Sequence, residues 1–317
     1  VLDFGIKKGM NKGFFANADL SAGTHSRYSE RLMGAGFQDK IRIMGFGNAN
    51  NVNDVGFHGG GGGRWGTPLQ GLNAKKLLGV NINYDDKSRL KLDGSARWNH
   101  SDGDVHSTQS IENFVNKSGA FSNSDNHNYT RGDSYDARFK LEWKPDTLTD
   151  ILLRPQFSYS ENDTQNSGLS ATYNDNPYIY SDNPLSTSVI EELKAEGMMV
   201  NSRSNCSVAY SESKSAGTKL QINRKLNKMG RNITLLGNVI YSDSKSNNLS
   251  MANVHLYQVK DRLGNDSIYQ TNRYSMTPTK NWKTDAQLTY SEPLWRGTFL
   301  QLSYKFTYNY KKSDRVT

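Results

Sequence analysis

The sequence predicts an all-β protein, an antiparallel up-and-down transmembrane β-barrel, and two observations support that prediction. The first is a side-chain period of two along nearly every strand-like segment, with one apolar side and one strongly polar side. The second is that short and long connections alternate along the chain. Both are typical of bacterial outer-membrane barrels, which have lipid outside and water or a plug inside.

The period of two is clearest in residues 89–99. Here one side carries Leu90, Leu92, Gly94, Ala96 and Trp98, and the other carries Lys91, Asp93, Ser95, Arg97 and Asn99. The second side is too charged for the core of a soluble protein. Many segments match the roughly 9–11 residues that a tilted strand needs to cross a bilayer. The other ten predicted strands are approximately 13–23, 27–36, 40–48, 71–85, 133–144, 150–161, 204–226, 231–245, 281–291 and 297–310.

The connections between these strands predict the topology. Tight connections are expected at Asp85–Ser88, Lys144–Thr149, Asn227–Gly230 and Glu292–Arg296. Long loops are expected at 49–70, 101–132, 162–203 and 246–280, with one or more helical turns in 188–199 and a hairpin from 251–260 and 267–276. Alternation of this kind is expected when one end of a barrel faces the periplasm and the other faces outside.

Composition excludes several classes of protein. The chain has 317 residues, 35% of them hydrophobic, and a mean hydropathy of −0.76. No stretch approaches the roughly 20 apolar residues of a membrane-spanning helix. The net charge is +8, but we find no clustered basic helix or base-stacking motif, so nucleic acid is not an expected partner. Cys206 is the single cysteine, which rules out an internal disulfide.

The sequence also predicts where several individual residues lie relative to the barrel. Aromatic residues at strand ends are expected to form two belts at the membrane interfaces, because amphipathic rings prefer that environment. Leu236 and Ile240 lie on the polar side of 231–245, and we expect them to contact something inside the barrel, such as a plug. Pro155, which cannot donate a ladder hydrogen bond, predicts a bulge. The candidate interface residues are Trp98, Trp143, Trp282, Trp295, Tyr308 and Tyr310.

No motif in the sequence predicts enzyme chemistry, a cofactor or a bound metal. The glycine run at 56–66 lacks the Lys-Ser/Thr of a phosphate-binding loop. The six histidines show no metal-ligand spacing, and residues 123–133 lack the glycine and glutamate positions of an EF-hand loop. We therefore expect no catalytic residues, and we expect the chain not to be an enzyme.

The first residues resemble a known junction. Val1, Leu2, Asp3, Ile6, Lys7 and Lys8 resemble the last plug strand of TonB-dependent outer-membrane receptors, V-[IL]-[ND]-x-x-[IL]-K-K, and Gly13-Phe14-Phe15 then resembles the start of the barrel. Residues 27–54 and 223–232 resemble the outer-membrane β-barrel subfamily of these receptors. The resemblance implies a barrel of 22 strands, of which about 11–12 are present. Residues 1–10 would be the last plug strand, and 11–317 part of the barrel.

The resemblance also implies a function. The protein would take up a nutrient ligand at the bacterial outer membrane, driven by the TonB energy-transducing complex acting through the plug. Outer-membrane lipid and a surface lipoprotein are further expected partners. The sequence leaves two alternatives open. One is a complete smaller barrel, porin-like or enzymatic, whose first and last strands would pair, whereas a partial barrel leaves two unpaired edges. The other is a surface adhesin made of β-sheet.

Overall fold

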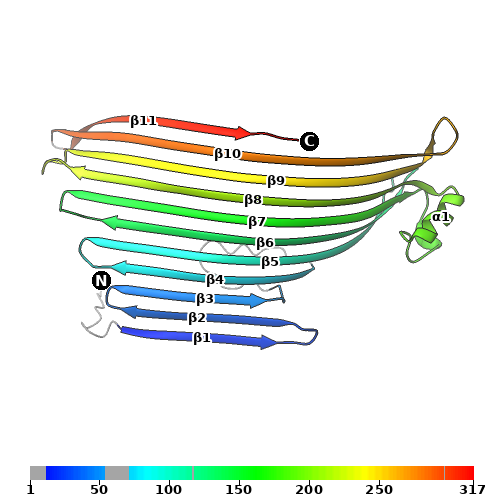
Figure 1. Cartoon of the computed structure of the whole chain (residues 1–317), viewed down its shortest axis with the longest axis horizontal. Helices are drawn as coiled ribbons and strands as arrows, with labels where there is room; N and C mark the ends of the chain where they lie inside the picture. Colours follow the sequence, from blue (N-terminus) through cyan, green and yellow to red (C-terminus); the bar gives the residue numbers. More distant parts are fainter. Residues whose placement is uncertain (1–11, 54–70, 116–117, 296) are drawn as a thin grey trace.

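The computed structural model describes residues 12–53, 71–115, 118–295 and 297–317, which form one eleven-stranded antiparallel sheet (Figure 1). Each strand pairs with the strands before and after it in sequence, so the predicted all-β, up-and-down fold is confirmed. The strands are β1 (Lys12–Ala22), β2 (Tyr28–Gln38), β3 (Ile41–Asn50), β4 (Leu72–Asp85), β5 (Leu90–Glu112), β6 (Phe121–Trp143), β7 (Thr149–Tyr173), β8 (Met199–Lys225), β9 (Asn232–Lys260), β10 (Asp266–Trp295) and β11 (Thr298–Ser313).

The sheet has two edges, β1 and β11, and these two strands do not pair with each other in the part of the chain that the structure describes. The closure expected of a complete twelve-stranded barrel is therefore not seen among these residues. The predicted plug strand at residues 1–10 and the glycine run at 56–66 lie outside the described residues.

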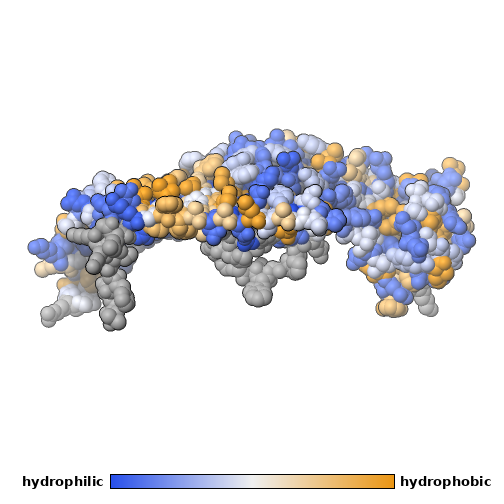
Figure 2. Space-filling view, turned by 90° about the horizontal axis from the view of Figure 1, so that it is seen from below, coloured by the Kyte–Doolittle hydropathy of each residue, from blue (hydrophilic) through white to orange (hydrophobic). Residues whose placement is uncertain are grey.

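The described strands form a single layer, with no second sheet packed against them. As a result, large apolar side chains are exposed: Phe139, on the interior strand β6, is 49% exposed, and Leu302, on the edge strand β11, is 59% exposed. Figure 2 shows hydrophobic side chains gathered along the near edge of the sheet, in its left half. This arrangement is the opposite of a β-sandwich, in which such residues would be buried between two sheets.

One end of the sheet is made of tight turns, as predicted (Figure 1, left). In the β4–β5 turn the Asp86 carboxylate accepts hydrogen bonds from the backbone N–H groups of Ser88, Arg89 and Leu90, at 2.7–2.9 Å. The bonds from Leu90 and Ser88 lower the pKa of Asp86 to about 2, because they stabilise its charged form. The β10–β11 turn begins only after Trp295, since a bulge between Pro293 and Trp295 lets β10 continue.

The other end departs from the prediction, because strands β5–β10 continue far into the expected loops. The segments 101–132, 162–203 and 246–280 are largely strand, and the true connections are 113–120, 174–198 and 261–265. The hairpin predicted from 251–260 and 267–276 is confirmed as the outer part of β9 and β10. These polar extensions keep the register of the inner parts of the same strands. Backbone ladder hydrogen bonds therefore hold them in the sheet, without alternation of apolar and polar side chains.

The bulge predicted at Pro155 is wrong. Arg138 pairs with Gln156 and Leu141 pairs with Leu153, so the register is the same on both sides of the proline and no residue is inserted. Two pairs of the β6–β7 ladder are missing instead, as expected for a residue without an N–H group.

The β7–β8 connection carries the helical turn η1 (Pro177–Ile179), which the sequence did not predict, and the helix α1 (Thr187–Ala195), which agrees with the helical turns predicted in 188–199. α1 ends in a Schellman motif. Gly197 has a φ of 73°, its N–H donates to Lys194 O, and the N–H of Met198 donates to Leu193 O. Leu193 is fully buried against Tyr173, Met198 and Met199, which folds the connection back onto the sheet. Within the described residues, no helix is long and apolar enough to cross a membrane.

Candidate functional site

The two faces of the sheet differ in chemistry. Residues that are paired directly across neighbouring strands lie on the same face of the sheet. We call the face that carries Leu92, Ala96 and Phe139 the apolar face. Between the tight turns and the level of Trp98 this face is almost entirely apolar. Three of its rows, read from β4 to β10, are Tyr84, Leu92, Leu141, Leu153, Leu220, Gly237 and Ala286; Ile82, Gly94, Phe139, Pro155, Thr218, Val239 and Thr284; and Val80, Ala96, Ala137, Phe157, Ala216, Tyr241 and Trp282.

Aromatic residues bound this apolar band at both ends. At the outer side Trp98 faces Tyr135, and one row nearer the turns Trp282 faces both Tyr241 and Tyr310. In a barrel the strands are tilted, so residues at the same height lie in different rows on different strands. A belt of aromatic residues at one height would therefore shift by a row over a few strands. Of the other predicted interface residues, Trp143 lies at the tight-turn end of β6, Trp295 at that end of β10, and Tyr308 on the apolar face of β11. Their contact with a membrane interface stays a prediction.

The spacing of the two belts is the same on different strands. Tyr135 and Trp143 are eight residues apart on β6, and Trp282 and Tyr290 are eight residues apart on β10. Eight residues span about 27 Å along a strand. With a strand tilt of about 40° this corresponds to a band roughly 20 Å tall, close to the apolar band of outer-membrane barrels.

Just beyond Trp98 the apolar face becomes charged. Trp98 Nε1 donates to Asp133 Oδ1 at 2.9 Å, and buried His100 lies between Asp133 Oδ1 (3.0 Å from Nδ1) and Asp102 Oδ2 (2.9 Å from Nε2). Asp133 therefore has two partners on this face, the Trp98 indole and the His100 ring. The change from apolar to ionic within one row marks a sharp boundary.

The opposite face, which we call the polar face, carries the charged side chains that the sequence places there. Lys140 pairs with Glu142 and lies 3.9 Å from Asp93, and Lys283 Nζ lies 3.7 Å from Asp285 Oδ2. Asp285 also accepts hydrogen bonds from Asn238 and Thr307. These charges lie on the same strand segments as the apolar band, but on the opposite face of the sheet.

Leu236 and Ile240 lie on the polar face, as the sequence indicates. Leu236 pairs with Gln221 and Gln287, and Ile240 pairs with Gly217 and Lys283. Ile240 also has a role within the sheet, because its Cγ1 lies 3.2 Å from where a Cβ of Gly217 would be. A large side chain of one strand thus covers a glycine of the next. Contact of Leu236 or Ile240 with a plug remains a prediction.

Phe46 and Gly79 repeat this arrangement on the polar face. A Cβ on Gly79 would lie 2.3 Å from Phe46 Cζ, so the ring occupies the space above the glycine. The guanidinium of Arg97, directly opposite Gly79 on β5, lies 5.6 Å from the centroid of the Phe46 ring. The ring therefore fills a gap in the sheet and also makes a cation–π contact.

Further out, the polar face loses its charge. We call three consecutive rows from β5 to β10 the neutral wall, because they hold only Ser, Thr, Asn, Gly and Ala. The apolar face at the same level carries His100, Asp102, Asp133, Glu161 and Glu212, so the neutrality belongs to one face alone. The wall consists of Asn99, Ser134, Ser160, Ser213, Ser244 and Thr279; Ser101, Gly132, Asn162, Ser211, Ser246 and Thr277; and Gly103, Thr130, Thr164, Ala209, Asn248 and Ser275.

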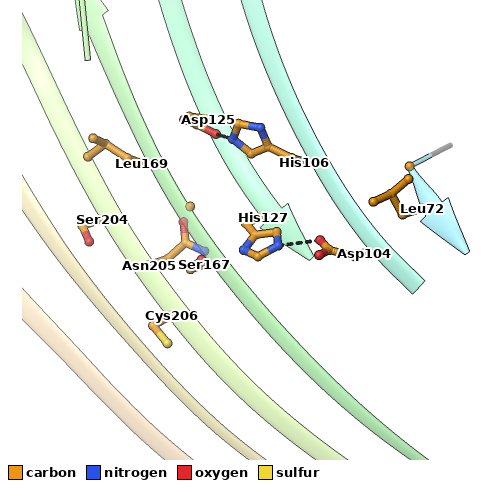
Figure 3. Close-up of a pocket in the computed structure, with 12 residues that line it drawn as sticks. Leu72, Asp104, His106, Asp125, His127, Ser167, Leu169, Ser204, Asn205 and Cys206 are labelled. Carbon is orange, nitrogen blue, oxygen red and sulfur yellow. Dashed lines mark hydrogen bonds and ion pairs between the residues drawn. The ribbon is translucent and has the colours of Figure 1, made fainter. Parts of the chain in front are cut away.

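Two His–Asp pairs line a shallow pocket of about 910 Å³ on the outward continuation of the apolar face (Figure 3). His106 Nε2 lies 2.5 Å from Asp125 Oδ1, and His127 Nε2 lies 2.6 Å from Asp104 Oδ1. The two rings meet edge-on, with centroids 6.2 Å apart. Cys206 approaches the pocket from β8. In the part of the chain described, no group of three or more His, Cys, Asp or Glu is placed to hold a metal ion.

Comparisons with known proteins give little more. No protein-family model and no curated protein matches the chain. Two of the solved structures that match do so only weakly. The toluene transporter TodX of Pseudomonas putida has 9% sequence identity, a TM-score of 0.24, and a match over 95% of this chain and 86% of its own. The CymD monoaromatic hydrocarbon channel has 8% identity, a TM-score of 0.23, and coverage of 98% and 87%. These TM-scores are too low for either similarity to support a conclusion about fold or function.

Proposed function

We propose that this chain forms part of the wall of an outer-membrane β-barrel that transports a solute. The single observation that supports this most strongly is the apolar band, which is one layer thick, exposed, and bounded by aromatic rings and then by charge. Exposing so much apolar surface to water is unfavourable, and lipid is the environment that would make it favourable. The band height of roughly 20 Å fits a bacterial outer membrane.

The polar face supports the second half of the proposal. Charged side chains directly behind a lipid-facing band would be costly in hydrocarbon, so they require water or protein on their side. A curved sheet with lipid outside and an aqueous or plugged space inside meets both requirements. Leu236 and Ile240 would then be available for contact with a plug.

The finer assignment is a TonB-dependent receptor, and it rests on the resemblance of residues 1–15, 27–54 and 223–232 to that family. In this assignment the outer ends of β3–β10 and their connections would bind a nutrient, which would pass inward as the plug rearranges, without any bond being made or broken. The TonB complex, acting through the plug, would supply the energy, and a surface lipoprotein would be a further partner. A complete smaller barrel is the alternative within the same membrane.

A soluble adhesin is the competing class of function, and the single-layer sheet argues against it. In a soluble β-protein, residues such as Phe139 and Leu302 would be covered by a second layer. Among the described residues nothing covers them.

Cysteine labelling tests the proposed orientation. In a Cys206→Ser background, Val80→Cys and Asn81→Cys place adjacent thiols on opposite faces of β4. With the protein in lipid vesicles, a membrane-impermeant maleimide should label Asn81→Cys and spare Val80→Cys. On intact cells, Leu263→Cys in the β9–β10 turn should be labelled, whereas Lys228→Cys in the β8–β9 turn should not. Equal labelling at positions 80 and 81 would refute the assignment of faces.

Energy coupling needs a test of its own. If the receptor assignment is correct, uptake of the ligand by cells should stop when the TonB gene is deleted, while surface labelling of Leu263→Cys stays the same. Uptake that continues at the same rate without TonB would favour the porin-like alternative.

A further inference from the structure

The outer end of the sheet holds a small cavity within the region that the proposed receptor would use to contact its ligand. It has a volume of about 250 Å³ and lies where the β7–β8 connection folds over the outer parts of β5 and β6. Thr108 and Ser110 of β5, Asn123 and Asp125 of β6, and Tyr178 and Asp182 of the connection line it. The cavity is thus built from three separate parts of the chain and lies well beyond the apolar band.

Asn123 is the feature of this cavity that needs a physical explanation. Its side chain is only 3% exposed, yet neither Nδ2 nor Oδ1 has a hydrogen-bond partner. A buried amide without partners is destabilising by about 1–3 kcal/mol, so buried polar groups in folded proteins are nearly always paired. An amide offers a donor and an acceptor side by side. A ligand that complements it must present an acceptor and a donor at neighbouring positions.

The other lining groups narrow the class of ligand. Asp182 contributes a carboxylate, Asp125 contributes the carboxylate whose Oδ1 is already bonded to His106, and Ser110 and Thr108 contribute hydroxyl groups. Tyr178 contributes an aromatic ring, a flat apolar surface. Adjacent hydroxyl groups on a ring with an apolar face match this combination, because each hydroxyl both donates and accepts. The two carboxylates disfavour anionic ligands.

The connection that closes the cavity is fixed in place. The hydroxyl of buried Tyr173 donates to Pro184 O at 2.9 Å, and Asn176 Oδ1 accepts from the backbone N–H of Tyr178 at 3.0 Å. α1 anchors the rest of the connection through buried Leu193, and Lys194 Nζ lies 3.0 Å from Asp266 on β10. The site is therefore largely formed before any ligand arrives, which lowers the entropic cost of binding.

From these observations we propose that the cavity is a binding site for one uncharged sugar ring, held by Asn123 and the two aspartates and stacked on Tyr178. The site lies in the outer region proposed above to bind a nutrient and names a ligand class for it, but its geometry does not depend on transport. It would give the cell-surface end of the protein a contact with carbohydrate whether or not the sheet lines a transport path.

The test uses saturation-transfer NMR to measure the binding of free glucose, galactose and N-acetylglucosamine to the detergent-purified protein. We expect saturable binding of at least one of these sugars. Asn123→Leu should weaken it by more than tenfold without lowering the thermal unfolding temperature, since the variant removes an amide that has no partner. Asp182→Asn, an exposed position, should weaken it at least threefold. Asn128→Leu, on the opposite face of β6, is the matched control and should leave affinity unchanged.

Two outcomes would overturn the proposal. One is the absence of saturable binding by all three sugars. The other concerns the two variants together. Asp182→Asn would bind with unchanged affinity, and Asn123→Leu would either bind with unchanged affinity or fail to fold. Neither outcome affects the labelling pattern at positions 80 and 81, so failure of this site and failure of the membrane assignment are distinguishable.

Discussion

Placing a cation in the middle of the apolar band would test the membrane assignment quantitatively. Val80 is the best position, because it lies on the apolar face midway between Lys76 and Tyr84 on β4. Four residues on either side correspond to about 10 Å of depth for strands tilted by about 40°. Val80 would therefore sit near the bilayer midplane, whereas the native Lys76 lies where the face has become charged.

The expected cost follows from this depth. Arginine on the lipid face of a barrel is destabilising by about 2–4 kcal/mol at the midplane and by about 0–1 kcal/mol near the interface. Val80→Arg should therefore lower the free energy of unfolding by about 2–4 kcal/mol, a factor of roughly 30–1000 in the equilibrium constant. Leu78→Arg, closer to the interface, should cost about 0–1 kcal/mol. Ala96→Arg, directly opposite Val80, should behave like Val80→Arg.

The assay is denaturant unfolding of the protein in lipid vesicles, followed by tryptophan fluorescence. Asn81→Arg is the matched control, because its side chain lies on the polar face beside Met44 and Ser95, and it should change stability by no more than about 0.5 kcal/mol. Ser95→Arg would be a poorer control, since Arg138 lies directly opposite. Equal costs for Val80→Arg and Asn81→Arg would refute the reasoning, because both faces would then have the same environment.

Three further predictions concern the sheet and its ends. Gly197→Ala should destabilise the α1 connection by about 1–2 kcal/mol, because only glycine adopts a φ of 73° without strain; hydrogen exchange at Met198 would report it. Gly79→Ala should cost about 1–3 kcal/mol in denaturant unfolding, but much less in a Phe46→Ala background that frees the space above it. Because Asp86 has a lowered pKa, its stabilisation of the β4–β5 turn should be complete above its ordinary pKa near 4 and should disappear as the pH falls through about 2. Amide exchange in the turn should follow this pH profile, and Asp86→Asn should abolish the pH dependence.

Each of these predictions has an outcome that contradicts it. For the helix end, protection at Met198 that is the same in Gly197→Ala as in the native protein would mean that the Schellman geometry is not required. For the sheet, equal costs of Gly79→Ala with and without Phe46 would show that the ring is not what excludes a Cβ. For the turn, identical pH profiles of the native protein and Asp86→Asn would show that the carboxylate does not order it.

The sequence predicts the half of the sheet nearest the tight turns well, because two signals agree there. Alternation such as Leu90-Lys91-Leu92-Asp93 specifies a strand and its facing, and turn residues such as Asp86 specify where it reverses. All eleven strands therefore exist where they were expected, with correct tight turns and correct faces. Only the β10–β11 turn differs by a few residues, since the bulge at Pro293 cannot be read from the local sequence.

The outer half could not be predicted in the same way. Segments such as 101–112 and 121–132 have two polar faces, so no contrast in hydropathy reveals a strand, and Ser, Asn and Asp have low strand propensity. Their structure depends on a register inherited from the inner half. The cavity at Asn123 was equally hidden, because it exists only once the distant connection 174–198 folds over β5 and β6. The role of Ile240 above Gly217 required the register of β8 and β9.

The length of the outer strand extensions has a consequence for how this protein can vary. β5 continues fourteen residues past Trp98, to Glu112, which at about 3.3 Å per residue and a tilt of about 40° is a rise of roughly 35 Å above the aromatic belt. The tips of the strands therefore lie far from the apolar band. If the sheet lies in the outer membrane as proposed, substitutions among Tyr178, Asp182 and their neighbours would change what the cell surface displays, while the fit of the sheet to lipid would stay the same.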